Sequence, residues 1–163
     1  SGRYSGVMLL ALGADHAGFA LKQVISTYVQ ELGHEVLDLG THDGTTSVDW
    51  PDFGAAVGRA VAGKQADLGI LVCGSGIGVA IAANKINGVR AATVTDVTSA
   101  RLCREHNHAN VVCFGARLTG EQTVLDAVAA YLSATPGEAR HGRRVAMLAD
   151  LEQQSAINEE NGQ

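Results

Sequence analysis

Short apolar runs alternate with amphipathic stretches along most of this chain of 163 residues. Five apolar runs have the length and composition of buried strands, and they span residues 7–13, 34–40, 68–73, 90–95 and 110–115. Between them apolar residues recur with the period of a helix, which predicts helices over 18–33, 53–63, 77–86, 98–107 and 120–134. Parallel strands need crossover connections, and right-handed crossovers place helices on both faces of the sheet. We therefore predict an α/β fold: a single-domain, doubly wound, five-stranded parallel sheet of the Rossmann-like or flavodoxin-like three-layer type.

The two ends of the chain are predicted to lie outside this sheet. We place the domain at residues 7–152 and interpret residues 1–6 as a disordered N-terminal extension. The stretch EARHGRRVAMLADLE, which starts at residue 138, predicts a C-terminal helix. Residues 153–163 are interpreted as a polar, mobile tail.

Composition and charge argue against several classes of protein. An apolar fraction of 46% with 20 glycines and only 4% aromatic residues is typical of a compact α/β protein. The net charge of −5 argues against a nucleic-acid-binding surface. There is no apolar run long enough to span a membrane and no signal peptide, so we expect a cytoplasmic protein. The three cysteines include no CxxC pair, which indicates neither a disulfide framework nor a zinc site, and no metal is expected.

The glycine loop CGSGIG follows the third predicted strand at residues 73–78. In sheets of this type ligands bind outside the carboxyl ends of the strands, where the strand order reverses. The loop is not a nucleotide fingerprint, because Val79 stands where GxGxxG needs glycine and no GK[ST] is present. Its backbone N–H groups would suit a single phosphate or the oxyanion of an enolate-like intermediate.

Two further loops carry polar residues that have more than one interpretation. In GADHAG after the first strand, Asp15 is either a helix cap or a ligand contact. His16 there and His106 in REHNHAN are either surface histidines or catalytic groups. Cys73 is either a core residue or a reactive thiol, whereas the other two cysteines are interpreted as core.

A cationic cluster near the C-terminus comprises Arg140, His141, Arg143 and Arg144. On a helix Arg140 and Arg144 share a face and could clamp a phosphate together. The alternative is a solvated helix face paired with nearby glutamates.

Five stretches resemble, in order and spacing, the type B ribose-5-phosphate isomerases and related sugar-phosphate isomerases. They are GADHAGFALK, DWPDF, CGSGIGVAIAANK, REHNHANVVCFGAR and ARHGRRV, and the resemblance covers about residues 8 to 150. It implies a five-stranded doubly wound domain, no cofactor, a phosphorylated sugar as substrate, and a homodimer or dimer of dimers with sites at the subunit interface.

The resemblance also implies residue roles. Cys73 matches the base of one branch of the family, while another branch has a glutamate where Val79 stands. His106 matches the residue that helps to open the furanose ring, and Asp15 lies near the ring oxygen and hydroxyls. The groups that hold O1 and O2 of the open chain match Asn107 and the backbone of Gly74, Ser75, Gly76, Ile77 and Gly78. The residues that hold the phosphate or the far end of the sugar match His16, Arg117, Arg140 and Arg144, and the family takes some of these from the partner subunit.

The implied reaction is ribose 5-phosphate to ribulose 5-phosphate through a cis-enediolate. Trp50 stands where the family commonly has tyrosine, which leaves allose 6-phosphate, a tetrose 4-phosphate and galactose 6-phosphate as alternative substrates. A phosphate- or nucleotide-binding module on the same fold is a rival outside the enzymes, but it leaves Cys73 and His106 without a role. A thiol-based redox protein is a third interpretation, weakened because no resolving cysteine lies nearby.

Overall fold

A five-stranded parallel sheet forms the centre of the computed structural model, which describes residues 6–162. The strands are β1 (Leu9–Ala14), β2 (Glu35–Asp38), β3 (Leu68–Cys73), β4 (Ala91–Thr93) and β5 (Val111–Gly115). Their order is β2-β1-β3-β5-β4, and all neighbours are parallel. The chain runs from β1 outward to β2 and then crosses back to β3, so the strand order reverses between β1 and β3. A ligand crevice is expected at the carboxyl ends of these two strands.

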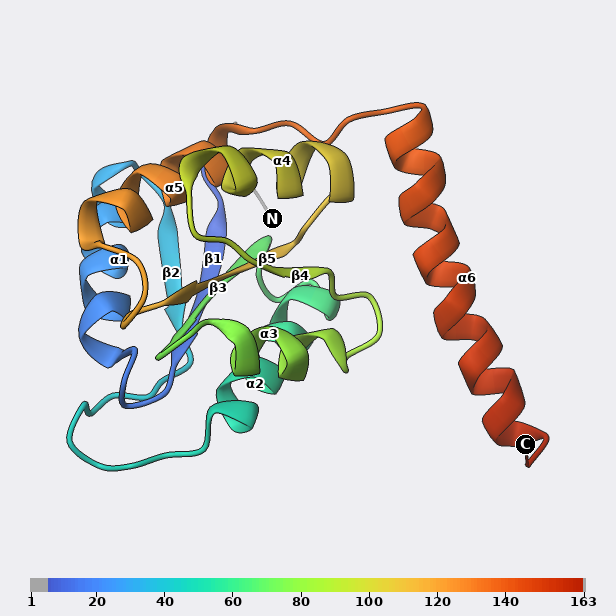
Figure 1. Ribbon diagram of the computed structural model, residues 1–163, viewed down its shortest axis with the longest axis horizontal. Helices are drawn as coiled ribbons and strands as arrows, with labels where there is room; N and C mark the ends of the chain where they lie inside the picture. The colour runs from blue at the N-terminus through green and yellow to red at the C-terminus, as the bar shows by residue number, and fades with distance from the viewer. Residues whose placement is uncertain (1–5, 163) are drawn as a thin grey trace.

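Helices cover both faces of the sheet, as Figure 1 shows. One face carries α1 (Phe19–Glu31), α4 (Val97–Asn107) and α5 (Glu121–Ser133), and the other carries α2 (Trp50–Ala62) and α3 (Ile77–Asn84). Alternate strand residues serve the two layers: Leu10 and Leu12 pack into the first, and Ala11 packs into the second. The predicted three-layer doubly wound fold is confirmed.

The last helix, α6 (Arg140–Glu160), stands beside the sheet rather than on it (Figure 1). None of its residues, all of which the structure describes, is buried. It starts close to the end of α4, and further along Glu152 accepts hydrogen bonds from the Gly88 N–H at 3.0 and 3.2 Å. Within residues 6–162 no helix is both long enough and apolar enough to cross a membrane.

Most elements begin or end within two residues of the predicted bounds, and the largest differences are at α2 and α6. Helix α2 begins at Trp50, ahead of the predicted residue 53, because proline at position 51 fits the first turn of a helix. The sequence predicts a polar tail from residue 153, but α6 continues to Glu160, since the segment contains good helix formers and no glycine before Gly162. The predicted extension at residues 1–6 lies, apart from Gly6, outside the described residues.

A buried ion pair anchors the segment that leads from β2 toward the crevice. Lys22 lies on the buried side of α1, only 1% exposed, and its amine contacts both carboxylate oxygens of Asp38 at 2.6 and 2.7 Å. Asp38 also accepts the Gly40 N–H at 2.9 Å. The following Thr41 N–H donates to the Ala14 carbonyl at 2.7 Å, so this loop is held against the end of β1.

Candidate active site

The chain turns tightly from the end of β3 into α3 through the glycine loop. Gly76 precedes α3 with φ of 76°, in the left-handed region that favours glycine. A Cβ at Gly76 would lie 2.7 Å from the carbonyl carbon of Phe114, and one at Gly115 would lie 2.6 Å from the Ser75 backbone. The loop therefore rests on the end of β5 at a distance that only glycine allows.

Cys73 points its sulfur into this turn. Its side chain is 4% exposed, and the Gly76 N–H donates to Sγ at 3.2 Å. Burial raises the pKa of the Cys103 thiol to about 11 and raises the pKa of Cys113 even further. Of the three thiols, Cys73 is the one placed to react.

A cleft of about 630 Å³ opens in front of this sulfur. It lies at the reversal point between β1 and β3, as expected for this fold. The lining residues come from the loops after β1, β3 and β5 and from α2 and α3, and they are Asp15, His16, Ala17, Trp50, Cys73, Gly74, Ser75, Ile77, Gly78, Ile81, Arg117 and Leu118. Across residues 6–162 there is no group of three His, Cys, Asp or Glu side chains arranged to hold a metal ion.

Asp15 and His16 lie on the loop between β1 and α1. Asp15 is buried, and its Oδ1 accepts the Gly18 N–H at 3.0 Å, so the carboxylate holds the loop before α1 while it also lines the cleft. His16 Nδ1 accepts the Val48 N–H at 3.2 Å. Because Nδ1 is an acceptor, neutral His16 carries its proton on Nε2, where it can be donated to an anionic ligand.

Arg117 and Trp50 form further walls of the cleft. The Arg117 guanidinium lies over Gly74, with Nη1 only 3.1 Å from where a Cβ would stand on that glycine. The Trp50 ring packs on Gly78, where an added Cβ would lie 2.8 to 3.0 Å from three ring atoms. Trp50 remains 40% exposed, so one part of its indole faces the cleft. A cation and an aromatic wall thus flank the glycine loop.

The remaining predicted site residues form a second group, far from Cys73 in the chain's own fold. His106 and Asn107 end α4 and precede the first residue of β5, whereas Cys73 lies at the last residue of β3. In a parallel sheet these are opposite ends. His106, Asn107 and Arg144 line their own cleft of about 340 Å³ with three further residues: His141, Val145 and Leu148.

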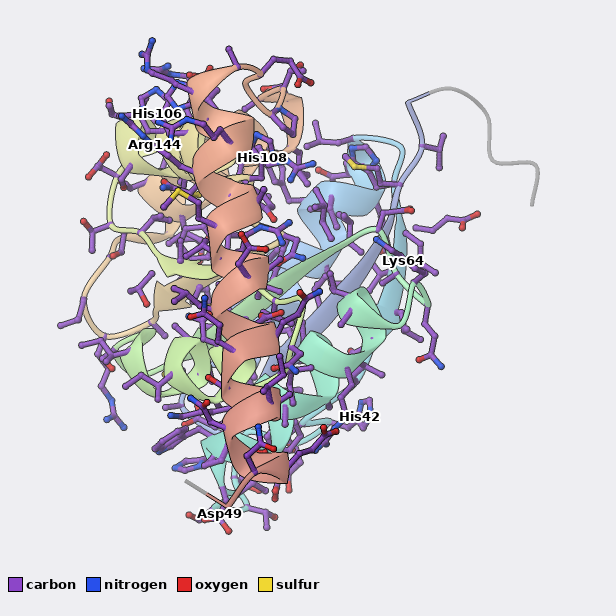
Figure 2. The ribbon with its side chains drawn as sticks, turned by 90° about the vertical axis from the view of Figure 1, so that its right-hand side faces the viewer. His42, Asp49, Lys64, His106, His108 and Arg144 are labelled. Carbon is purple, nitrogen blue, oxygen red and sulfur yellow. The ribbon has the colours of Figure 1, made fainter. Side chains whose placement is uncertain are left out.

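Figure 2 shows how α6 contributes to this second group, with His106 and Arg144 together on one side of its first turns. Arg140 is the first residue of α6 and is exposed. The sequence pattern singled out His141 only as part of a charge cluster, but its ring stacks on the ring of His106. No periodicity or spacing signals such a contact between two elements.

Comparison with known proteins identifies the family. The family model for Ribose/Galactose Isomerase matches residues 10–148. The chain is 42% identical to ribose-5-phosphate isomerase B of Escherichia coli, over 88% of this chain and 96% of that protein. It is also 40% identical to the galactose-6-phosphate isomerase subunit LacB of Clostridium acetobutylicum, over 78% of this chain and 73% of that protein.

Solved structures agree with these sequence matches. Ribose-5-phosphate isomerase B of Clostridium thermocellum has a TM-score of 0.89 and 42% identity, covering 91% of this chain and 99% of its own. The enzyme of Mycoplasma genitalium with bound ribulose-5-phosphate has a TM-score of 0.86 and 36% identity, covering 89% and 96%. This chain belongs to the Ribose/Galactose Isomerase family and is an aldose–ketose isomerase that acts on sugar phosphates.

Proposed function

We propose that this isomerase interconverts ribose 5-phosphate and ribulose 5-phosphate. The observation that carries the proposal is the Cys73 sulfur, which accepts the Gly76 N–H in a cleft lined by Asp15, His16 and Arg117. Many of the relatives, including those of Escherichia coli and Mycobacterium tuberculosis, are named ribose-5-phosphate isomerase B.

In this proposal the Cys73 thiolate is the base. It removes the proton from C2 of the open-chain aldose, and the electrons of the C–H bond form the C1–C2 double bond of a cis-enediolate. The same sulfur returns the proton to C1, and the hydroxyl proton on O2 passes to the O1 oxyanion, so that the C1 hydroxyl and the C2 carbonyl of the ketose form. Backbone N–H groups of the glycine loop stabilise the charge on oxygen during these steps.

We also propose that the working unit is a homodimer, or a dimer of such dimers. A ring-opening histidine must touch the same sugar as the base, yet His106 lies at the opposite end of the sheet from Cys73. A second copy would supply its own His106 and Asn107 to the Cys73 cleft. Arg140 and Arg144 would then join His16 and Arg117 around the phosphate and the far end of the sugar.

The exposed side of α6 supports this assembly. Its exposed large apolar residues are Met147, Leu148, Leu151 and Ile157. Between α6 and the β4 edge lies a groove of about 510 Å³, with apolar lining residues such as Val89, Ala92 and Val145. A second copy seated on this side would remove the apolar surface from water.

The test is a panel of phosphorylated aldoses with direct detection of ketose formation. We expect the highest kcat/KM with ribose 5-phosphate. Values with free ribose should be far lower, because free ribose has no phosphate for the basic residues of the proposed site to bind. Equal rates with ribose and its phosphate would contradict the proposal. A higher kcat/KM with allose 6-phosphate, erythrose 4-phosphate or galactose 6-phosphate would replace the substrate but keep the reaction.

A further inference from the structure

The imidazole rings of His106 and His141 lie face to face. Their centroids are 4.3 Å apart and their planes differ by 8°. His106 is in the last turn of α4 and His141 is in the first turn of α6, so the contact joins two different elements. Since a parallel stack covers a ring's face, both nitrogens of His106 stay on the uncovered edge.

The segment between α5 and α6 holds His141 in this place. The Gly137 N–H donates to the Glu105 carbonyl at 2.7 Å, and His108 Nε2 lies 2.6 Å from the Gly137 carbonyl oxygen. A Cβ at Gly137 would lie 2.8 Å from the Glu105 oxygen and 2.9 Å from Cδ2 of His141. The start of α6 is therefore fixed to the end of α4 by two hydrogen bonds besides the ring stack.

Four basic residues lie near His141, and the Glu138 carboxylate is 4.0 Å from the Cβ position of the neighbouring Gly142. Partial desolvation, followed by the nearby His106, Arg140, Arg144 and His108, lowers the pKa of His141. A lowered pKa favours the neutral form of a histidine. In the neutral form His141 can stack on the His106 ring without adding a positive charge.

We propose that His141 is a positioning residue for His106. His106 is exposed at a helix end, where an unsupported side chain exchanges between staggered rotamers. The His141 ring restricts it to one orientation, with its nitrogen edge directed to the sugar during ring opening. The catalytic consequence rests on the proposed function, whereas the stacking contact does not. Orientation of a reacting group is a large component of catalysis, and small misplacements are costly.

Three variants separate this role from a direct contact with phosphate. His141→Phe keeps a flat ring face but has no nitrogen, and His141→Ala removes the ring. Arg143→Ala is the matched control, because Arg143 lies in the same turns of α6 and contacts Met147 Sδ at 3.9 Å. We expect His141→Ala to lower kcat about tenfold with little change in KM, and His141→Phe to retain most of the activity. The control should match wild type.

Two kinetic results would overturn the proposal. If His141→Ala keeps full kcat, the stack does not position His106. If Phe and Ala variants both raise KM for the phosphorylated substrate with kcat unchanged, His141 is a phosphate ligand instead.

An NMR measurement without substrate tests the proposal even if the enzyme acts on a sugar phosphate other than ribose 5-phosphate. In a proton NMR spectrum the C2–H resonance of His106, assigned with a His106→Gln variant, should carry a ring-current shift in wild type and in His141→Phe. That shift should disappear in His141→Ala. An unchanged His106 resonance in His141→Ala would overturn the positioning role, whatever sugar the enzyme accepts. If the wild-type protein isomerises none of the sugars in the panel, the proposed function is wrong, but the NMR test of the positioning role still stands.

Discussion

The backbone N–H of Gly76 donates to the sulfur of Cys73 at 3.2 Å, across a turn that also starts α3. Gly76 adopts a left-handed conformation at this turn, which favours glycine at the position. The sulfur is thus held by the same turn that starts α3, in a cleft that Arg117 also lines.

Replacing Cys73 should remove the base and leave the binding site. We expect Cys73→Ala to lower kcat by roughly 10²–10⁴-fold with KM little changed, because the loop N–H groups and arginines remain. Cys73→Ser should fail almost as badly, since a hydroxyl scarcely ionises. Steady-state kinetics with the phosphorylated aldose checks both. Most of the wild-type rate in Cys73→Ala would identify the thiol as core packing.

Iodoacetamide should inactivate the enzyme through Cys73, and substrate should protect it. The pKa of about 11 leaves on the order of one Cys103 thiol in a thousand ionised at pH 8, so that residue should react very slowly. Mass spectrometry of partly alkylated protein should therefore show Cys73 modified first. A Cys103→Ala variant, inactivated at the wild-type rate, is the control. Modification of Cys103 ahead of Cys73 would contradict this expectation.

Gly76→Ala should destabilise the glycine loop. The new Cβ would meet Phe114 backbone at 2.7 Å while φ stays at 76°, and we expect a loss of about 2–4 kcal/mol in the free energy of unfolding. Urea denaturation measures the loss. Gly120→Ala is the control, because nothing lies within 4 Å of its Cβ position. Equal stabilities of the two variants would show that the loop relaxes freely.

Trp50→Ala should change the preference for sugar length. The indole occupies one wall of the cleft beside Gly78, and its removal makes room for a longer substrate. We expect kcat/KM for a six-carbon aldose phosphate to rise about tenfold relative to that for ribose 5-phosphate. His42→Ala is the control, since His42 is exposed and does not line the cleft. An unchanged ratio would exclude Trp50 as a specificity residue.

Two inactive variants should restore activity when mixed. In a dimer of Cys73→Ala with His106→Ala, one of the two sites receives an intact Cys73 and an intact His106. Random exchange of subunits then gives about a quarter of the wild-type activity. Light scattering should show a dimer or a larger even assembly. A fully active monomer would overturn the shared site.

Asp38→Ala should leave the buried amine of Lys22 without its carboxylate. We expect a loss of about 3–5 kcal/mol in the free energy of unfolding, because an unpaired buried charge is costly. The double variant Lys22→Met, Asp38→Ala should recover much of that loss. Thermal or urea unfolding of both variants checks this. If Asp38→Ala only loses packing contacts, the double variant will be no more stable than Asp38→Ala.

The local hydrophobic pattern was sufficient to predict the helices and strands, but not the order of the strands in the sheet. The strand Leu68–Cys73 is predicted residue for residue, because an unbroken apolar run ends at a glycine loop. The insertion of β5 between β3 and β4 was not predictable, since strand order depends on packing between distant segments. Lys22 lies within a helix face that pattern alone would leave to apolar residues, and only its partner Asp38 explains its burial.

The position of the Cys73 cleft in the fold was predictable, but the arrangement of the predicted site residues was not. The Cys73 cleft follows from the rule that ligands bind at the carboxyl ends of parallel strands. The distance of His106 from that cleft does not, because α4 runs back along the sheet and delivers its last turn to the other end. The order of residues along one chain does not tell which subunit of an assembly supplies each residue of a site.

The separation of Cys73 and His106 to opposite ends of one sheet also bears on how such a protein can evolve. In the proposed dimer, one copy can lose its thiol and the other its histidine after gene duplication, and a mixed pair still keeps one complete site. Each copy is then indispensable to the other, although neither has gained a new residue. A fold with this layout can thus pass from one gene to two interdependent genes through losses alone.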